Sequence, residues 1–183
     1  MVSILDKLAN KQGDTTKSAS WYKNAISSIG QKISANKLMA QGTLTARPNL
    51  GLLNLFFYDP KYKESLPYYD TFPLVLPLEA IKGGFSGLNF HYLPPLLRLR
   101  LLENMQRYAT SPRLKDARFD VSWARVKNIP MIKPTIKKYL YKHVRSSFLK
   151  IDLTQAAIAC YLPVQQFQKR PAGSVYNASR SMV

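Results

Sequence analysis

The sequence predicts an α+β protein: a small antiparallel sheet or SH3-like barrel at about residues 50–92, with an N-terminal helix before it and basic C-terminal helices after it. The 183 residues are 46% hydrophobic, which is enough for one domain with a core. Three short apolar runs between turn signals predict the sheet. Apolar residues spaced about four apart, before and after those runs, predict the helices.

Residues 1–47 are predicted to form a helical arm, in which residues 1–17 are weakly ordered. From Ser18 to Ala40, apolar residues recur about every fourth position, at Trp21, Ala25, Ile29, Ile33 and Leu38. This spacing is typical of an amphipathic helix, although Gly30 disfavours a helix by about 1 kcal/mol. The helix either packs on its own domain or binds a neighbouring subunit. In the second case the candidate contacts are Trp21, Ile29 and Ile33.

A single α+β domain is predicted for residues 48–170, and three runs of sequence predict its sheet. They are GLLNLFFYD (51–59), FPLVLPL (72–78) and FSGLNFHY (85–92), and their aromatic residues are typical of strands. Pro73 and Pro77 lie four residues apart, which suits an edge strand or a strand end. The sequence Lys82-Gly83-Gly84 predicts a tight turn before the third strand.

The stretch YDPKYKESLPYYD (58–70) places three carboxylates, four tyrosines and two prolines between two apolar runs. In one interpretation, Asp59 and Asp70 meet at the mouth of a loop and hold a metal ion for a nuclease. In the other, the stretch only connects two strands, since Asp-Pro commonly starts a turn. The connecting loop is the favoured interpretation, and Tyr68 and Tyr69 are then candidate contacts with a partner.

Beyond the sheet, the sequence predicts two helices, a strand and a tail. Pro94-Pro95 opens the first helix, LLRLRLLENMQRY, because proline is tolerated in the first turn. TIKKYLYKHVRSSFLK (135–150) is predicted as the second helix, from apolar residues at i+4 spacing: Ile136, Leu140, Val144 and Phe148. AAIACYL (156–162) is predicted as a short buried strand, and residues 171–183 as an irregular tail.

Charge is the strongest functional signal in the sequence. The chain has 27 basic and 10 acidic residues, a net charge of +17, which points to a polyanionic partner. Fourteen of the basic residues and three of the acidic ones lie within residues 96–150. Aromatic residues are interleaved with them, so bases can stack where phosphates are neutralised. These aromatic residues are Tyr108, Trp123, Tyr139 and Tyr141.

Double-stranded DNA, bound without sequence preference, is therefore a predicted partner, because phosphate contacts carry no sequence information. The residues that we expect to contact nucleic acid are Arg98, Arg100, Arg107, Arg113, Lys115, Arg118, Arg125, Lys127, Lys137, Lys138, Lys142 and Arg145. The other interpretation is a solvated basic face, or one that binds an acidic protein surface.

No catalytic motif, metal site or cofactor is predicted. His91 and His143 are the only histidines and Cys160 is the only cysteine, and no flanking motif pairs them. The glycines of GGFSG (83–87) precede a predicted strand, so they suit a hairpin turn better than a phosphate-binding loop. No apolar stretch approaches about 18 residues and residues 1–17 lack the pattern of a secretion signal, so we expect no membrane partner.

Four blocks of the sequence resemble a family of small virion structural proteins from T4-like contractile-tailed phages. They are LFFYDPKYKESLPYYDTFPLVLPLE (55–79), KGGFSGLNFHYLPPLLR (82–98), KKYLYKHVRSSFLKID (137–152) and SVYNASR (174–180). The resemblance spans roughly residues 50–180 and does not cover the N-terminal arm. Some members of that family are labelled DNA end protectors, and the family supplies no catalytic residues.

The resemblance implies a non-enzymatic structural protein of the phage virion, made in the host cytoplasm and assembled at the head–tail or neck region. There it would contact packaged DNA or its ends, together with other virion proteins. Two alternatives stay open. One is a structural tail or baseplate component that contacts only proteins, and the other is a metal-dependent nuclease.

Overall fold

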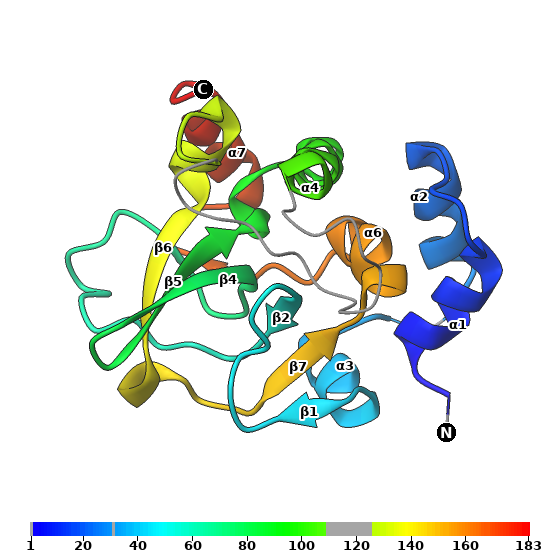
Figure 1. The fold of residues 1–183 in the computed structure, drawn as a ribbon, viewed down its shortest axis with the longest axis horizontal. Coiled ribbons are helices and arrows are strands. Elements are labelled where there is room, and N and C mark those ends of the chain that lie inside the picture. Colours follow the sequence, from blue (N-terminus) through cyan, green and yellow to red (C-terminus); the bar gives the residue numbers. More distant parts are fainter. Residues whose placement is uncertain (1, 31, 109–125) are drawn as a thin grey trace.

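The computed structural model describes residues 2–30, 32–108 and 126–183, and its centre is a six-stranded antiparallel sheet (Figure 1). The strand order is β1-β7-β2-β4-β5-β6. The strands are β1 (Leu44–Thr45), β2 (Leu53–Leu55), β4 (Leu74–Ile81), β5 (Gly84–Asn89), β6 (Ile136–Leu140) and β7 (Phe148–Ile151). Because β1 and β6 lie at opposite ends of this order, the sheet is open. The predicted α+β class is confirmed, with an open sheet rather than a barrel.

The β4–β5 hairpin is the part of the sheet that the sequence predicted best. Its turn contains Gly83, whose φ of 73° is a left-handed conformation that glycine adopts without strain. A Cβ atom on Gly84 would collide with the Tyr139 carbonyl of β6, so glycine at this position lets the two strands pair closely. The strand predicted to reach residue 92 ends at Asn89, and Phe90–Tyr92 form the 3-10 turn η1.

The helix predicted for residues 135–150 is wrong. This segment contains β6, the 3-10 turn η4 (Tyr141–His143) and β7. The four apolar residues that predicted the helix lie four positions apart, and positions four apart also share one face of a strand. The spacing therefore fits both structures, and the β-branched and aromatic side chains of the segment favour the strand.

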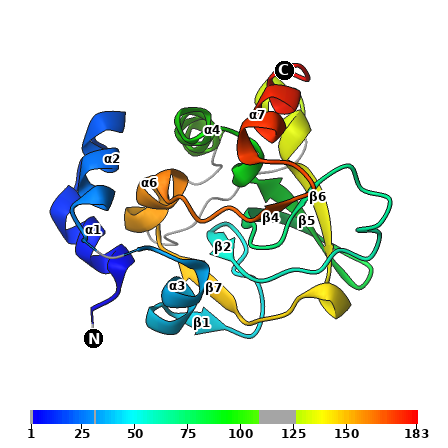
Figure 2. The same ribbon diagram turned by 180° about the vertical axis from the view of Figure 1, so that it is seen from behind.

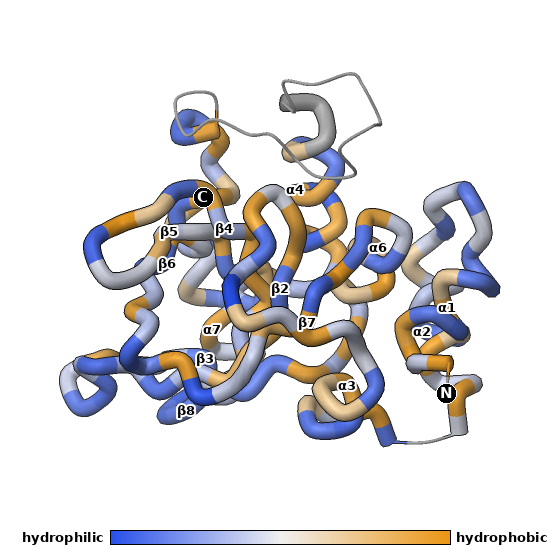
Figure 3. Tube along the Cα trace, turned by 60° about the horizontal axis from the view of Figure 1, so that its bottom comes forward, coloured by the Kyte–Doolittle hydropathy of each residue, from blue (hydrophilic) through white to orange (hydrophobic). Residues whose placement is uncertain are grey.

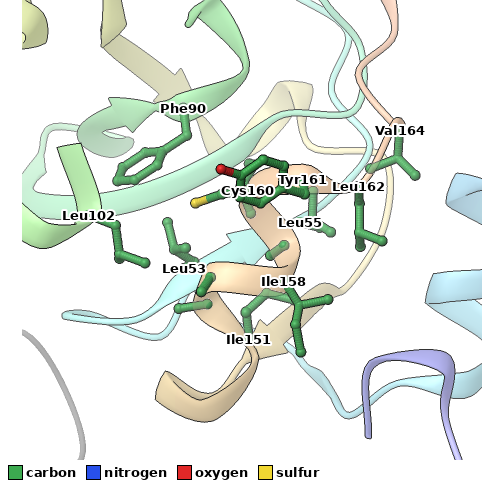
Figure 4. Packing of buried hydrophobic residues seen from close by; sticks show 14 of the residues in the cluster. Leu53, Leu55, Phe90, Leu102, Ile151, Ile158, Cys160, Tyr161, Leu162 and Val164 are labelled. Atoms are coloured by element: carbon green, nitrogen blue, oxygen red, sulfur yellow. The ribbon is translucent and has the colours of Figure 1, made fainter. Parts of the chain in front are cut away.

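The strand predicted for residues 156–162 is also wrong, because most of these residues lie in helix α6 (Leu153–Tyr161). The backbone N–H of Asp152 donates to Gln155 Oε1 (3.0 Å) at its N-terminus, which is one half of a capping box. Figure 4 shows the side chains of this helix packed among Leu53 and Leu55 of the sheet and Leu102 of helix α4 (Pro95–Tyr108). A helix that is apolar on nearly all sides has no amphipathic period by which to recognise it.

The N-terminal residues form three short helices, α1 (Ile4–Gln12), α2 (Ala19–Ser27) and α3 (Ala35–Gln41). A single helix from Ser18 to Ala40 is therefore wrong: the chain turns at Gly30, which has a φ of 66°. The prediction that residues 1–17 are weakly ordered is also wrong for the residues of α1, which places Ile4, Leu5 and Leu8 in the main core. Serine hydroxyls cap the helices, because Ser3, Ser18 and Ser34 each accept a backbone N–H.

The helix predicted after Pro94-Pro95 is confirmed as α4 (Pro95–Tyr108). A further 3-10 segment, η3 (Pro130–Thr135), precedes β6. The irregular tail predicted for residues 171–183 is wrong, since α7 (Ala172–Arg180) buries Val175 and Ser179. Figure 2 shows α7 from behind, beside the end of the sheet that carries β6. The division into an arm, one domain and a tail stays a prediction.

Two hydrophobic clusters lie on opposite faces of the sheet. The main cluster includes Leu74, Leu76 and Leu88 together with the helices, and hydrophobic residues gather where β2, α4 and α6 meet (Figure 3). The smaller cluster is mostly aromatic and consists of Phe56, Tyr58, Val75, Phe85, Tyr139 and Phe148. No helix in the described ranges is both long and apolar enough to cross a membrane.

Candidate nucleic-acid interface

The loop of residues 58–70 runs beside β6, the strand at one edge of the sheet (Figure 1). The Leu140 backbone N–H of β6 donates to the Tyr58 hydroxyl (3.1 Å), and the Asp59 backbone N–H donates to the His143 carbonyl (3.0 Å). The loop ends in β3 (Tyr69–Asp70), which pairs with β8 (Phe167–Gln168) in a second small sheet. The loop is thus fixed to the protein at both of its ends.

A pocket of about 450 Å³ lies between this loop and β6, and we call it the tyrosine pocket. Its residues come mainly from the loop and from β6, with Asn89 of β5 and Tyr92 of η1. Six tyrosines line it (Tyr58, Tyr62, Tyr68, Tyr69, Tyr92 and Tyr139), together with three lysines (Lys61, Lys137 and Lys138). Asp70 is the acidic residue of the lining, and it is 4% exposed. The pocket therefore combines aromatic walls with positive charge.

Lys137 is a half-buried cation in the tyrosine pocket. Its Nζ lies 4.1 Å from the centroid of the Tyr92 ring, which is a cation–π contact. Burial lowers the pKa of Lys137, because its charged form loses hydration. The ion pairs found within the described segments do not include Lys137. An anion that binds beside it would therefore stabilise its charged form.

The outer wall of the pocket is held by Lys169, which follows β8. Its Nζ donates to three carbonyls of the loop, those of Lys63 (2.6 Å), Glu64 (2.9 Å) and Leu66 (2.8 Å). Lys169 has a φ of 69°, which is unusual for a residue with a side chain. The next residue, Arg170, lies 5.7 Å from the centroid of the Tyr68 ring. These contacts fix the loop from the C-terminal part of the chain.

Asp70, which lines the pocket, is held in a buried hydrogen-bond network. Its Oδ1 accepts the backbone N–H groups of Phe72 (3.0 Å) and Gln166 (3.1 Å), and its Oδ2 lies 2.8 Å from His91 Nδ1. Burial alone would raise the pKa of Asp70, but His91 and the two amides more than offset it and lower the pKa. Burial lowers the pKa of His91. We therefore assign a neutral imidazole whose Nδ1–H donates to the carboxylate.

Arg98 is buried, so its predicted contact with nucleic acid is wrong. Its guanidinium donates to the carbonyls of Leu93 (2.7 Å) and Cys160 (3.1 Å) and to the Tyr176 hydroxyl (2.8 Å). It also donates to the His91 carbonyl (3.4 Å). α7 supplies Tyr176 and α6 supplies Cys160, so two of these partners lie in helices that the sequence did not predict.

The other predicted DNA-contacting residues divide into three groups. Those with exposed side chains are Arg100, Lys127, Lys138, Lys142 and Arg145, and Lys137 is half-buried. Arg145 lies 3.5 Å from Asp59 Oδ2 in an exposed ion pair. The predictions for Arg113, Lys115, Arg118 and Arg125, and for the side chain of Arg107, lie outside the described residues. Among the rest, Lys137 and Lys138 are brought together in the tyrosine pocket.

The residues predicted to contact a partner protein lie in different environments in the structure. Ile33 is buried in the core of its own chain, so its proposed contact with a partner is wrong. Trp21 and Ile29 are half-buried against the same core, as expected for helices that pack on their own domain. Tyr68 and Tyr69 line the tyrosine pocket instead of a flat surface.

Several residues of this site were not among the contacts predicted from the sequence. They are Tyr58, Lys61, Tyr62, Tyr92 and Lys169. The available signal was the density of tyrosines in residues 58–70, next to lysines in the same stretch. What the sequence did not reveal is that β6 lies beside this loop, because residues 135–150 were expected to be helical.

The two carboxylates considered for a nuclease are engaged separately. Asp59 accepts from Lys63 Nζ (2.9 Å) and pairs with Arg145, whereas Asp70 is held by His91 and backbone amides. Within the described ranges, no group of three or more His, Cys, Asp or Glu side chains is placed to hold a metal ion. Burial raises the pKa of the Cys160 thiol to about 12, which disfavours the reactive thiolate.

The fold and the site define a class of protein: a small basic α+β protein with an aromatic pocket that carries lysines. A family model described as the Phage T4 terminal DNA protecting protein matches residues 2–182, so the chain belongs to this phage protein family. The match confirms the family resemblance in the sequence and extends it over the N-terminal helices. No curated protein and no solved structure matches the chain.

Proposed function

We propose that this protein is a non-enzymatic component of the virion that binds the ends of double-stranded DNA near the head–tail junction and shields them from exonucleases. Its family is described as DNA protecting. The observation that carries the proposal is a net charge of +17 combined with lysines beside the tyrosine pocket. Contacts between such residues and phosphates release counterions and do not depend on base sequence.

Protection of this kind requires only that the protein stays bound to the DNA end, and it involves no bond-breaking chemistry. A protein that covers the last base pairs denies an exonuclease its substrate for as long as the complex lasts. The engagement of Asp59 with Lys63 and of Asp70 with His91 supports this mode of action over metal-assisted cleavage.

An exonuclease protection assay tests the proposal. Linear duplex DNA is incubated with the protein and digested by an exonuclease that requires a free end, and closed circular duplex serves as the competitor. We expect protection to survive an excess of circular DNA. We also expect log affinity to fall with log salt by about 0.9 for each phosphate that the protein neutralises.

Three outcomes would contradict parts of the proposal. Protection that is lost to an equal mass of circular DNA would refute end binding. Cleavage of linear DNA by the protein with Mg²⁺ or Mn²⁺ would refute the non-enzymatic role. Density for the protein at the distal baseplate, and none at the neck, in a reconstruction of the virion would refute the location.

A further inference from the structure

We infer that the tyrosine pocket receives one unpaired nucleotide at the end of a DNA strand, with the base against the tyrosine rings and the phosphate beside Lys137 and Lys138. This inference rests on the proposed function. It adds the site on the protein and the form of the DNA end that the site recognises.

The size of the pocket suits a single nucleotide. Pockets that enclose small ligands have volumes of about 300–1,000 Å³, and this one has about 450 Å³. The pocket lies between the loop and β6, and we infer that a base leaves the stack of the duplex to enter it. Leaving the stack costs least for a base that is already unpaired, which favours a strand end over the interior of a duplex.

The lining of the pocket suits a base of any sequence. Aromatic rings stack on the π-face that every base has, so this kind of recognition tolerates sequence variation. The hydroxyls of Tyr92 and Tyr139 stay protonated, since burial raises the pKa of both. Neutral rings and hydroxyls of this kind do not repel the phosphate of an incoming nucleotide.

The charge of the pocket suits a phosphate. Lys137 is half-buried beside Tyr92, and none of the ion pairs among the described residues joins it to an acid. The next residue, Lys138, is exposed. The Asp70 carboxylate is the acidic residue of the lining and is buried, whereas three lysines line the same pocket. A phosphate that enters therefore meets cations whose charge is not already neutralised.

The loop that forms the outer wall is fixed before any ligand binds. Lys169 holds three of its carbonyls at 2.6–2.9 Å, and β3 anchors its end through β8. A wall that is already ordered loses little conformational freedom on binding, which favours affinity.

The test uses three DNA molecules of equal length and measures affinity by fluorescence anisotropy at a fixed salt concentration. The first is a hairpin whose single end carries one unpaired nucleotide, the second is a blunt hairpin, and the third is a closed dumbbell without an end. The pocket variants are Tyr62→Ala and Lys138→Ala. Their matched controls are Tyr141→Ala and Lys82→Ala, which change exposed side chains outside the tyrosine pocket.

We expect the wild-type protein to bind the overhang hairpin more tightly than the blunt hairpin, and the dumbbell least tightly. Tyr62→Ala should weaken binding of the overhang hairpin by about 5- to 150-fold, the equivalent of the ~1–3 kcal/mol that stacking one base contributes. Tyr62 is 64% exposed and Tyr141 is 47% exposed, so both variants should fold. The control variants should keep the wild-type preference for the overhang.

A direct readout accompanies the affinities. With 5-iododeoxyuridine as the unpaired nucleotide, ultraviolet light should cross-link it to a tyrosine of the pocket, identified by mass spectrometry. If the wild type prefers ends but the pocket variants match it, or if cross-links form only outside the pocket, the inference is overturned and end binding stands. If the wild type binds ends no better than the dumbbell, the proposed function itself fails.

Discussion

The guanidinium of Arg98 donates a 2.8 Å hydrogen bond to the hydroxyl of Tyr176, joining α4 to α7 across about eighty residues of sequence. The same side chain reaches the carbonyls of Leu93 and Cys160. It is therefore a buried cation that satisfies acceptors from three parts of the chain, and it belongs to the interior of the protein.

Replacing Arg98 should destabilise the fold strongly. We expect Arg98→Met to lower the free energy of unfolding by about 2–5 kcal/mol, because each buried acceptor left without a donor costs about 1–3 kcal/mol. The carbonyl and hydroxyl acceptors would be left without a donor, and the methionine would fill the space. Urea denaturation measures the loss. The control is Arg100→Ala, an exposed site two residues along α4, where we expect a change within about 0.5 kcal/mol.

The buried pair of Asp70 and His91 should make the stability depend on pH. Burial holds the pKa of His91 below its usual value, so the unfolded chain binds a proton that the folded chain does not. Stability should therefore fall as the pH drops below about 6.5, the ordinary pKa of histidine. The pKa of Asp70 is also lowered, so its contribution is present above about pH 3.9 and is lost as the pH falls through the folded pKa.

Urea midpoints measured between pH 5 and pH 8 test this dependence. The variant His91→Gln should be less stable than the wild type near pH 8 and should show a flatter profile between about pH 5 and pH 6.5, where histidine titrates. The control is His143→Gln, in which the other histidine is removed. A wild-type profile that is flat across this range would show that the pKa of His91 is the same in the folded and unfolded states, and a stability that falls as the pH rises would show that His91 is protonated in the folded protein.

The extent to which the sequence predicted the fold depends on how many structures each pattern fits. α4 was predicted because proline in a first turn precedes helix-spaced leucines, and the β4–β5 hairpin because glycines punctuate alternating residues. The strands β6 and β7 in residues 135–150 were not predicted, since the i+4 spacing of apolar residues there fits a helix as well as a strand. α6 was missed because burial on all sides removed its polar face.

The candidate site was predicted in part. Lys137 and Lys138 were selected on charge alone, which was sufficient because they stay near the surface. Arg98 was selected by the same rule and is buried, since a guanidinium can be satisfied inside a protein when enough acceptors surround it. The tyrosine pocket itself depends on the pairing of β5 with β6, and no local pattern in residues 58–70 contains that information.

Lys169 should control the order of the loop. We expect Lys169→Met, which keeps the aliphatic stem and removes the ammonium, to expose the loop to trypsin at Lys61 and Lys63. The cost in stability should be about 1 kcal/mol, because the lost hydrogen bonds are exposed to solvent. Limited proteolysis with mass spectrometry measures the cleavage. Lys82→Met, at the tip of the β4–β5 hairpin, is the control and should leave the loop resistant. Equal cleavage in the wild type and Lys169→Met would show that the three carbonyl contacts do not hold the loop.

Replacing Lys137 should raise the stability of the protein and weaken its binding to DNA ends. Because burial lowers its pKa, the unfolded chain binds protons more readily than the folded one, and the charged lysine weakens the fold at neutral pH. Lys137→Met should therefore be more stable than the wild type at pH 7, by about 0.5–2 kcal/mol. The difference should shrink as the pH rises toward about 10.4, the ordinary pKa of lysine, where both states of the wild type lose the proton.

The same substitution should weaken the binding of DNA ends and reduce the dependence of log affinity on log salt by about 0.7–0.9, the contribution of one phosphate contact. Thermal unfolding at pH 7 and pH 10 measures the first effect, and anisotropy over a salt series measures the second. Lys82→Met serves as the control for both, since this exposed lysine lies outside the tyrosine pocket and is not among the residues expected to contact nucleic acid. A Lys137→Met protein that is less stable than the wild type and binds DNA ends equally well would mean that Lys137 acts only through its contact with Tyr92. A Lys137→Met protein that is more stable and binds DNA ends more weakly would mean that the half-buried cation lowers stability and contributes to phosphate binding.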